Sequence, residues 1–489
     1  MKKIIVSVLA IATVFVSCDK WLDINTDPNT PSAVDNAQLI PSVEATLAGM
    51  VGGGLFNTAG FFAQYYEQSP EANQYNALCD YSFDNDLFTA SYRNFYAGAL
   101  EDAKVICRQA EEKEAWGDYF VATVLRAYIF QVIVDFIDQA PYTEALLGNE
   151  NPMPKWDSGE SIYTGILNEL DEAEGKLNSA SRVSSDLILD RDMNKWVQFA
   201  NALRLRILMR SSYALDQQSR ITALVQENNF FTGDVKFDVF VNESSRRNPW
   251  YETNRIVLSA TNHVGSLPMV SFLKETDDPR ISDIYIRATG PNSFEGMIPG
   301  SKVRIASHRN ADYSFLTAYD RATTPVYLFT QSELQFFIAE AYVRFLNDDA
   351  KAREAYETAI RANFATTRGL ADDPAVIFGE DAPSAWSTAT TADGKLKLIA
   401  TQKWVALCMI NNVEAWAEVR RMNYPVVSAR SAGEIYNDPT VYTAGELISP
   451  WTNAEADMVR RLYFPLTAVN LNDNTPKQVS RSVPVWWDK

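Results

Sequence analysis

The stretch WGDYFVATVLRAYIFQVIVDFIDQAPYTEAL, Trp116 to Leu146, decides the fold. Over its first two thirds, apolar side chains occupy almost every face of a helix with 3.6 residues per turn, which is typical of a helix buried on several sides. Arg126 and Asp135 interrupt the apolar run, whereas a bilayer span needs roughly 20 nearly uncharged residues. Pro141 predicts that the helix ends near Asp138. Other helices are therefore expected to pack around this one.

The composition is that of a globular chain with a large core, because 46% of the 489 residues are hydrophobic and 22% are charged. The formal net charge is -18 at pH 7. Proteins that bind nucleic acid draw affinity from Lys and Arg contacts to phosphate, so no nucleic-acid partner is expected. The same negative charge opposes adhesion to an anionic bilayer.

The N-terminus reads MKKIIVSVLAIATVFVSCDK. Two lysines, an apolar run and a small residue before Cys18 are typical of a lipoprotein signal peptide. We expect residues 1–17 to be removed, Cys18 to carry lipid and residues 18–33 to form a polar tether. An ordinary signal peptide with an incidental cysteine is the alternative, since Phe15 stands where Leu is usual. No later segment is suited to span a bilayer, so lipid would be the only membrane anchor.

Signals for metals and cofactors are weak. The segment 23–27 has the Asp-x-Asn-x-Asp spacing of a calcium loop, but Pro28 replaces its required Gly and Val34 its bidentate Glu. The later cysteines show no CxxC spacing and predict neither a zinc site nor a disulfide framework: Cys79, Cys107 and Cys408. We therefore expect no metal site and no cofactor.

Helical periodicity recurs along the rest of the chain. It predicts helices at 34–50, from Ser91 onward, and at 162–177, 195–210, 330–345, 352–359 and 395–422. The glycines at 52–54 are expected to end the first of these as a hinge or close-packing turn. Thr330 and Glu333 have the spacing of a capping box. A solvated or ion-paired face explains three basic residues better than an anion site does: Arg204, Arg206 and Arg210.

Residues 233–330 differ in character. The segments 237–242 and 302–307 alternate like short strands, and the rest is rich in Asn, Pro, Gly and Ser. Long irregular segments of this kind are often functional. Farther on, Ala352, Tyr356 and Ala359 have the spacing of the second helix of a tetratricopeptide repeat. The predicted fold is mainly α, a tetratricopeptide-like helical-repeat scaffold over 34–489 in a single domain, with long loops and a few short strands on one side.

Several segments of the sequence resemble segments of SusD/RagB-like outer-membrane lipoproteins. The pattern with which that family ends a central helix is similar to three features here: Arg126-Ala127-Tyr128, the acidic pair Asp135 and Asp138, and Ala140-Pro141-Tyr142. Ile137 stands where the family usually has Gly. The longer matches, in the family's order, are KWVQFANALRLR (195–206), LFTQSELQFFIAEAYVR (328–344), AREAYETAI (352–360), TQKWVALCMINNVEAWAEVRRMNYP (401–425) and RRLYFPLTAVNLN (460–472).

The resemblance implies a lipoprotein anchored in the outer membrane and facing the cell exterior. Such a protein captures oligosaccharide, or in the RagB-like alternative peptide, and delivers it to a SusC-type TonB-dependent transporter over which it closes as a lid. The matching segments belong mostly to the helical scaffold. They therefore indicate the fold and the partner better than the ligand.

Catalytic signals are few. Only His263 and His308 are present, and neither HExxH nor GxSxG occurs. A glycoside hydrolase needs only two carboxylates and is the enzymatic alternative. A purely structural surface protein is a further one. We expect a binding protein and no enzyme, because a lipidated helical scaffold with aromatic residues on its loops suits ligand capture.

The ligand site is predicted where the loops of residues 73–83 meet those of 247–313. Rings in segments without helical period are free to offer flat faces to sugars, and neighbouring polar groups can bond to hydroxyls. For each ring alone, a role as a core cap is the alternative. The predicted residues are Tyr75, Tyr81, Trp250, Tyr251 and Tyr313, with Asn73, Gln74, Asp80, Arg247 and Asn248.

Overall fold

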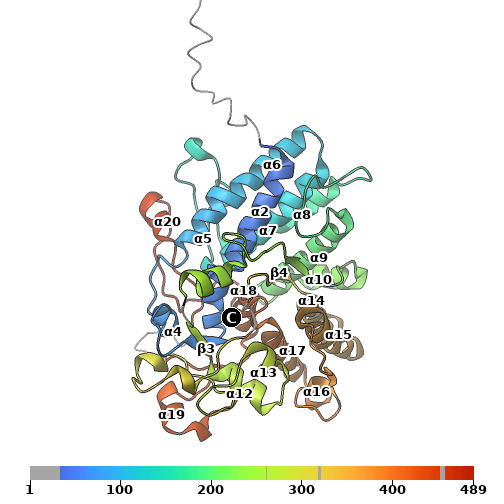
Figure 1. Ribbon diagram of the computed structural model, residues 1–489. Helices are drawn as coiled ribbons and strands as arrows, with labels where there is room; N and C mark the ends of the chain where they lie inside the picture. The colour runs from blue at the N-terminus through green and yellow to red at the C-terminus, as the bar shows by residue number, and fades with distance from the viewer. Residues whose placement is uncertain (1–33, 260, 318–320, 452–457, 489) are drawn as a thin grey trace, which may run out of the picture.

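The computed structural model describes residues 34–488, apart from Ala260, 318–320 and 452–457. The predicted signal peptide, Cys18 and the tether lie outside the described residues. Within the described part, helices predominate and the strands are short (Figure 1).

The central helix is α7 (Trp116–Ile137), and it ends where the sequence predicted. Asp138 follows it with φ +72°, and its backbone N–H closes the last turn onto the carbonyl of Val134. By length and composition α7 could cross a bilayer, yet 94% of its most apolar window is buried inside the protein. Its apolar residues therefore form the centre of the core.

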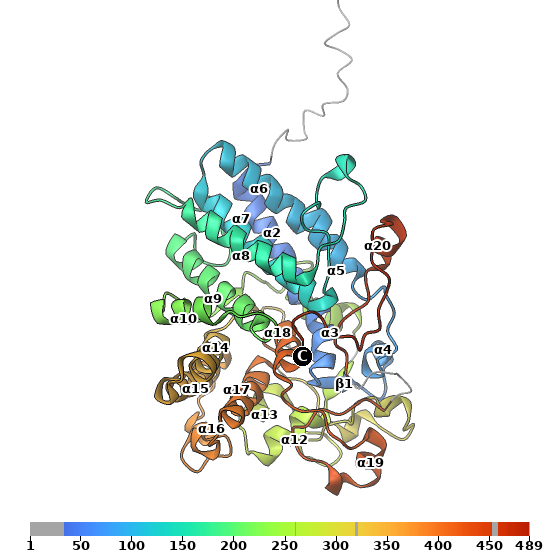
Figure 2. The same cartoon turned by 180° about the vertical axis from the view of Figure 1, so that it is seen from behind.

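Helix pairs stack along one side of the molecule, and both views show them following one another from α6 to α17 (Figures 1 and 2). In α15 the small residues Ala352 and Ala359 are fully buried, so α14 and α15 pack closely. This arrangement confirms the predicted tetratricopeptide-like scaffold. The stack contains α2 (Asn36–Val51), α6 (Glu101–Glu112), α7, α8 (Gly159–Gly175), α9 (Met193–Ser211), α10 (Gln218–Glu227), α14 (Gln331–Ala341), α15 (Asp349–Ala362), α17 (Ala392–Leu407) and α18 (Asn412–Met422).

A buried network of ion pairs joins α7, α9, α14, α17 and α18. Arg210 Nη1 lies 2.5 Å from Asp135 Oδ2, and Arg421 Nη2 lies 2.5 Å from Glu340 Oε2 and 2.6 Å from Glu418 Oε2. Buried charges are tolerated when they are paired in this way. The network ties together helices that are far apart in the sequence.

A solvated or ion-paired face was expected for the arginines of α9. The structure shows that they are ion-paired and buried, not solvated. Arg206 is 1% exposed and its Nε donates to Glu333 Oε1 at 2.8 Å. Of the predicted capping box, only the hydrogen bond to the Thr330 side chain is present. Thr330 Oγ1 accepts the N–H of Glu333 at 3.1 Å, whereas the Glu333 carboxylate is directed to Arg206.

The single helix expected over 395–422 is wrong, because the chain breaks between α17 and α18. Met409 has φ +58°, a left-handed conformation that an α-helix cannot contain. The side chain of Asn411 then caps α18 by accepting the N–H of Glu414 at 3.2 Å. The arginines at the end of α18 are buried, not solvent-facing.

The strands of the described residues form short two-stranded sheets. β1 (Tyr66–Gln68) pairs antiparallel with β3 (His263–Gly265), and β2 (Val235–Phe237) pairs antiparallel with β4 (Val326–Phe329). The strand expected at 237–242 is reduced to the end of β2. The strand expected at 302–307 is wrong, because residues 301–303 form a 3-10 turn. From this turn Lys302 donates to Asn73 Oδ1 and Asn76 Oδ1, each at 2.8 Å.

The glycines at 52–54 form a close-packing turn, as one of the expected alternatives held. A Cβ at Gly52 would lie 2.2 Å from a methyl carbon of Val326, so no larger residue fits there without movement. The chain turns and continues as α3 (Gly54–Phe62), which is almost entirely buried. The turn thus brings α3 under the loop side of the protein.

The remaining elements lie mostly among the loops. The short helices are α4 (Asn76–Cys79), α5 (Thr89–Asn94), α11 (Pro249–Tyr251), α12 (Leu267–Glu275), α13 (Arg280–Ile284), α16 (Ala375–Phe378), α19 (Ala432–Asn437) and α20 (Leu466–Leu471). The π-helical turns are η1 (Phe95–Leu100), η3 (Glu252–Val257), η6 (Tyr342–Leu346) and η7 (Asn363–Arg368). The 3-10 turns are η2 (Gly148–Glu150), η4 (Ser301–Val303), η5 (Asn310–Asp312), η8 (Trp386–Thr388) and η9 (Pro439–Val441).

Candidate functional site

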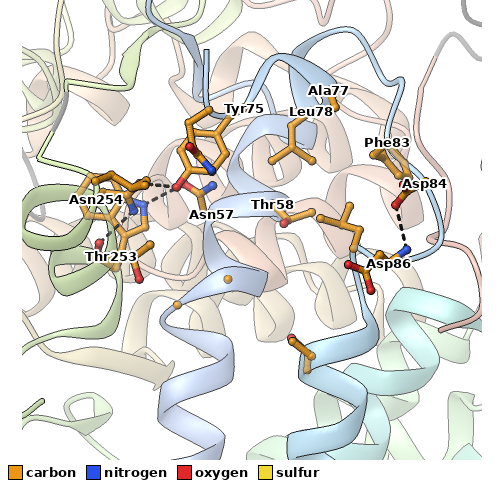
Figure 3. A pocket seen from close by; sticks show the side chains of 18 of the residues that line it. Asn57, Thr58, Tyr75, Ala77, Leu78, Phe83, Asp84, Asp86, Thr253 and Asn254 are labelled. Atoms are coloured by element: carbon orange, nitrogen blue, oxygen red, sulfur yellow. Dashed lines mark hydrogen bonds between the residues drawn. The ribbon is translucent and has the colours of Figure 1, made fainter. Parts of the chain in front are cut away.

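A pocket of about 560 Å³ opens where α3, α4, α5 and η3 meet. Its volume lies within the roughly 300–1,000 Å³ that is usual for small-ligand sites. Asn57, Tyr75 and Asn254 lie on one side of it, and Asp84 and Asp86 lie on the other (Figure 3). The pocket therefore forms between segments that are distant in the sequence.

The base of the pocket comes from α3, whose sequence GLFNTAGFF is apolar except for Asn57 and Thr58. Both polar residues line the pocket, and they are 6% and 5% exposed. Burying a polar side chain costs free energy unless it is hydrogen-bonded. The partners of Asn57 therefore decide what this part of the pocket presents to a ligand.

Asn57 accepts two hydrogen bonds at its Oδ1, from Trp250 Nε1 at 3.1 Å and from His263 Nε2 at 2.7 Å. The indole of Trp250 can only donate, so the oxygen of the amide must face it. His263 then carries its proton on Nε2. Burial holds the pKa of His263 well below its usual range, so the ring is neutral.

Tyr75 forms the wall next to Asn57 and is only partly buried. Its hydroxyl donates to Asn254 Oδ1 at 2.6 Å, and Asn254 Nδ2 donates to the carbonyl of Trp250 at 3.0 Å. The ring centroid of Tyr75 lies 5.6 Å from that of Phe61 and 5.2 Å from that of His263. These contacts fix the ring in place while part of it remains accessible from the pocket.

The opposite wall is the loop that leads into α5. Phe83 is mostly buried there, whereas Asp84 and Asp86 are exposed. Asp84 Oδ1 accepts the backbone N–H of Asp86 at 3.0 Å, a local turn that keeps both carboxylates on the same loop (Figure 3). No lysine, arginine or histidine is among the described residues that line the pocket.

Of the predicted site residues, Gln74, Tyr75 and Trp250 line this pocket. Trp250 is nevertheless 0% exposed, so it supports the wall from behind and cannot offer a ring face to a ligand. Tyr81 is 1% exposed and packs edge-on against Phe62 at 5.6 Å, as a core residue. The prediction that these two rings form an exposed platform is wrong, because long-range packing covers both.

The polar residues predicted near Trp250 have structural partners. Asn248 is buried, caps α11 by accepting the N–H of Tyr251 at 3.0 Å, and donates to the carbonyl of Thr324 at 2.9 Å. Arg247 donates to Glu252 Oε2 at 2.9 Å. Tyr251 itself is partly exposed but does not line the pocket. The structure does not bring these residues to the same cavity as Tyr75.

Three further predicted residues lie outside the pocket. Asn73 accepts a hydrogen bond from Lys302, and Asp80 accepts one from Ser82 Oγ at 2.6 Å within its own loop. The hydroxyl of Tyr313 is 2.7 Å from Nδ1 of His308. Tyr313 therefore belongs to a separate aromatic group on the loop side.

The sequence prediction missed much of the lining. One sequence signal could have indicated Asn57 and Thr58: they are two adjacent polar residues in an otherwise apolar helix. Asp84 and Asp86 follow directly after the predicted segment 73–83 and were excluded only by its boundary. Gly53 and Gly54 belong to the glycine run at 52–54, which was predicted only as a hinge or close-packing turn. Seven further lining residues lie inside the predicted segments 73–83 and 247–313 but were not named: Ala77, Leu78, Ser82, Phe83, Thr253, Asn254 and Leu258. The rest gave no distinctive pattern: Leu87, Ala90 and Ser91. Within the described residues, no group of three His, Cys, Asp or Glu side chains could hold a metal ion.

The fold and the pocket together describe a helical-repeat scaffold with a cavity among its loops. The chain belongs to the SusD-like family, because the family model described as "Starch-binding associating with outer membrane" matches residues 28–443. This confirms the family that the sequence words predicted. A comparison with curated proteins found no match.

Solved structures of SusD homologues share the fold over almost the whole chain. A Bacteroidetes SusD-like protein designated AC2a is 21% identical with a TM-score of 0.74, covering 93% of this chain and 100% of that one. A chitin-binding SusD homologue from Flavobacterium johnsoniae is 21% identical with a TM-score of 0.72, covering 92% and 99%. A further chitin-binding protein is 23% identical with a TM-score of 0.71, covering 93% and 100%.

Proposed function

We propose that this protein captures oligosaccharide in the pocket between Asn57 and Asp84 and delivers it to a SusC-type TonB-dependent transporter, over which it acts as a lid. It is held at the outer membrane, facing the cell exterior, by lipid on Cys18. The observation that carries the proposal is a pocket with an accessible aromatic ring and several hydrogen-bonding groups on a SusD-like scaffold.

The chemistry of the pocket suits a sugar. Pyranose rings present apolar C–H faces, which pack on aromatic rings such as that of Tyr75, and their hydroxyls bond to amides and carboxylates. Asn57, Gln74 and Asp84 supply such groups around the cavity. The family description names starch, and two solved relatives are named as chitin-binding. These names support a glycan more than a peptide, which remains an outcome of the test.

The test uses a glycine at the edge of the pocket. Gly54 lines the cavity, and a Cβ at this position would meet no atom within 4 Å. Gly54→Leu should therefore fill part of the pocket without disturbing the fold. Gly175→Leu is the matched control, since Gly175 also lies at a helix end with open space around it.

Calorimetric titration with a panel of oligosaccharides and peptides should show saturable binding of a glycan. Gly54→Leu should abolish it or weaken it at least tenfold, and Gly175→Leu should leave it unchanged. Equal binding by both variants would place the ligand elsewhere, and binding of peptides alone would favour the peptide function. Release of new reducing ends from a bound glycan would contradict capture without catalysis.

The anchor and the partner are tested in outer membranes. Mass spectrometry of the mature N-terminus should find acyl chains on Cys18, and Cys18→Ala should release the protein from the membrane fraction. A transporter should co-purify with the wild-type protein in mild detergent. Recovery of the wild-type protein alone would contradict the role as a lid.

A further inference from the structure

The pocket fixes the direction of one amide group. Asn57 is 94% buried, and its Oδ1 accepts two hydrogen bonds, from Trp250 and His263. Because the indole N–H can only donate, the amide cannot turn over without placing two donors against each other. Asn57 Nδ2 has no hydrogen-bond partner among the described residues, and Asn57 lines the pocket. The pocket therefore holds a fixed, unused N–H donor.

The opposite wall has the opposite character. Asp84 and Asp86 are exposed, and neither forms an ion pair with any residue that the structure describes. The nearby N-terminus of α3 contributes only about +0.5 of an elementary charge. Two full negative charges outweigh it, and no basic side chain of the described lining compensates them. Two arginines lie near the lining without forming part of it: Arg255 is 5.2 Å from the ring centroid of Trp250, and Arg481 is 5.8 Å from that of Phe83. Where Asp84 and Asp86 are exposed, a ligand in the cavity therefore meets a wall of net negative charge.

We infer that the pocket selects glycans that are uncharged or carry an amine, and excludes those that carry carboxylate or sulfate groups. Asn57 is the specificity-determining donor and bonds to a hydroxyl or acyl oxygen of the sugar. Trp250 and His263 are positioning residues that act through Asn57. Asp84 and Asp86 accept hydrogen bonds from hydroxyl or ammonium groups and repel anions. This inference rests on the proposed capture of oligosaccharide in the same pocket.

The experiment compares glycans of different charge, including two pairs that share a backbone. The probes are a homogalacturonan hexamer and its full methyl ester, together with chitohexaose, its deacetylated form and a hyaluronan hexasaccharide. The methyl ester and at least one of the two chitin-derived hexamers should bind at least tenfold more tightly than the carboxylated hexamers at low ionic strength. Added salt should bring the affinities for neutral and carboxylated hexamers closer together. The reason is that salt screens the charges of Asp84 and Asp86, which form the exposed rim of the pocket.

The rim is then neutralised without removing its hydrogen-bond acceptors. The double variant Asp84→Asn with Asp86→Asn should narrow the ratio between neutral and carboxylated ligands at least threefold. The matched control is Asp372→Asn with Asp381→Asn, which changes the net charge equally at exposed positions outside the pocket lining. It should leave the ratio unchanged.

The donor is tested by Asn57→Asp, which replaces the free N–H by an acceptor and should weaken binding of the neutral hexamers at least tenfold. If this variant does not fold, the rim variant decides, since its residues are exposed. Carboxylated hexamers that bind as tightly as neutral ones, or a ratio that the rim variant leaves unchanged, would overturn the inference alone. Failure of every glycan to bind would overturn the proposed function together with it.

Discussion

Replacing Tyr75 with alanine should weaken glycan binding while the protein stays folded. The ring is held from behind by Phe61 and His263, and its hydroxyl is fixed to Asn254, so its accessible part is preorganised for stacking. Loss of a well-placed aromatic contact costs about 1–3 kcal/mol. That range corresponds to roughly a 5- to 150-fold rise in Kd, because every 1.4 kcal/mol is tenfold.

Tyr75→Phe separates the ring from its hydroxyl. The ring remains, but Asn254, which is 1% exposed, loses a donor to its Oδ1, at a cost of about 1–3 kcal/mol in the free energy of unfolding. We expect Tyr75→Ala to change affinity strongly and Tyr75→Phe to change mainly stability. Calorimetric titration beside thermal unfolding measures both. Wild-type affinity in folded Tyr75→Ala would refute the assignment of this ring to the site.

Three further predictions concern the free energy of unfolding. Trp250→Ala should lower it by about 3–5 kcal/mol in urea titrations, because the indole is fully buried; an unchanged value would contradict its place in the core. Arg421→Met should cost about 3–5 kcal/mol by leaving the carboxylates of Glu340 and Glu418 buried without their main partner, and a cost under 1 kcal/mol would contradict that pairing. Burial raises the pKa of Glu67 from 4.5 to about 8. Since the folded state holds this proton more tightly, stability is fully present below about pH 4.5 and falls as pH rises through 8. Glu67→Gln should therefore raise Tm at pH 8.5 and change it little at pH 4.5, and an equal change at both would refute the assignment.

The sequence determined the scaffold of this protein. The end of α7 near Asp138 and the paired helices could be predicted because periodicity and Pro141 act over a few residues. The family could be predicted because its recurring words lie in those same helices. Even within the scaffold, the break at Met409 was not predictable, since no Gly or Pro marks it.

The pocket was decided by tertiary structure. Asn57 receives its hydrogen bonds from residues 193 and 206 positions away in the sequence, so nothing local indicated that its amide would face a cavity. Trp250 and Tyr75 both stand in aperiodic, polar surroundings, yet one is fully buried and the other partly exposed. Local sequence sets which residues form helices, whereas the exposure of a ring on a loop depends on which distant segments pack over it.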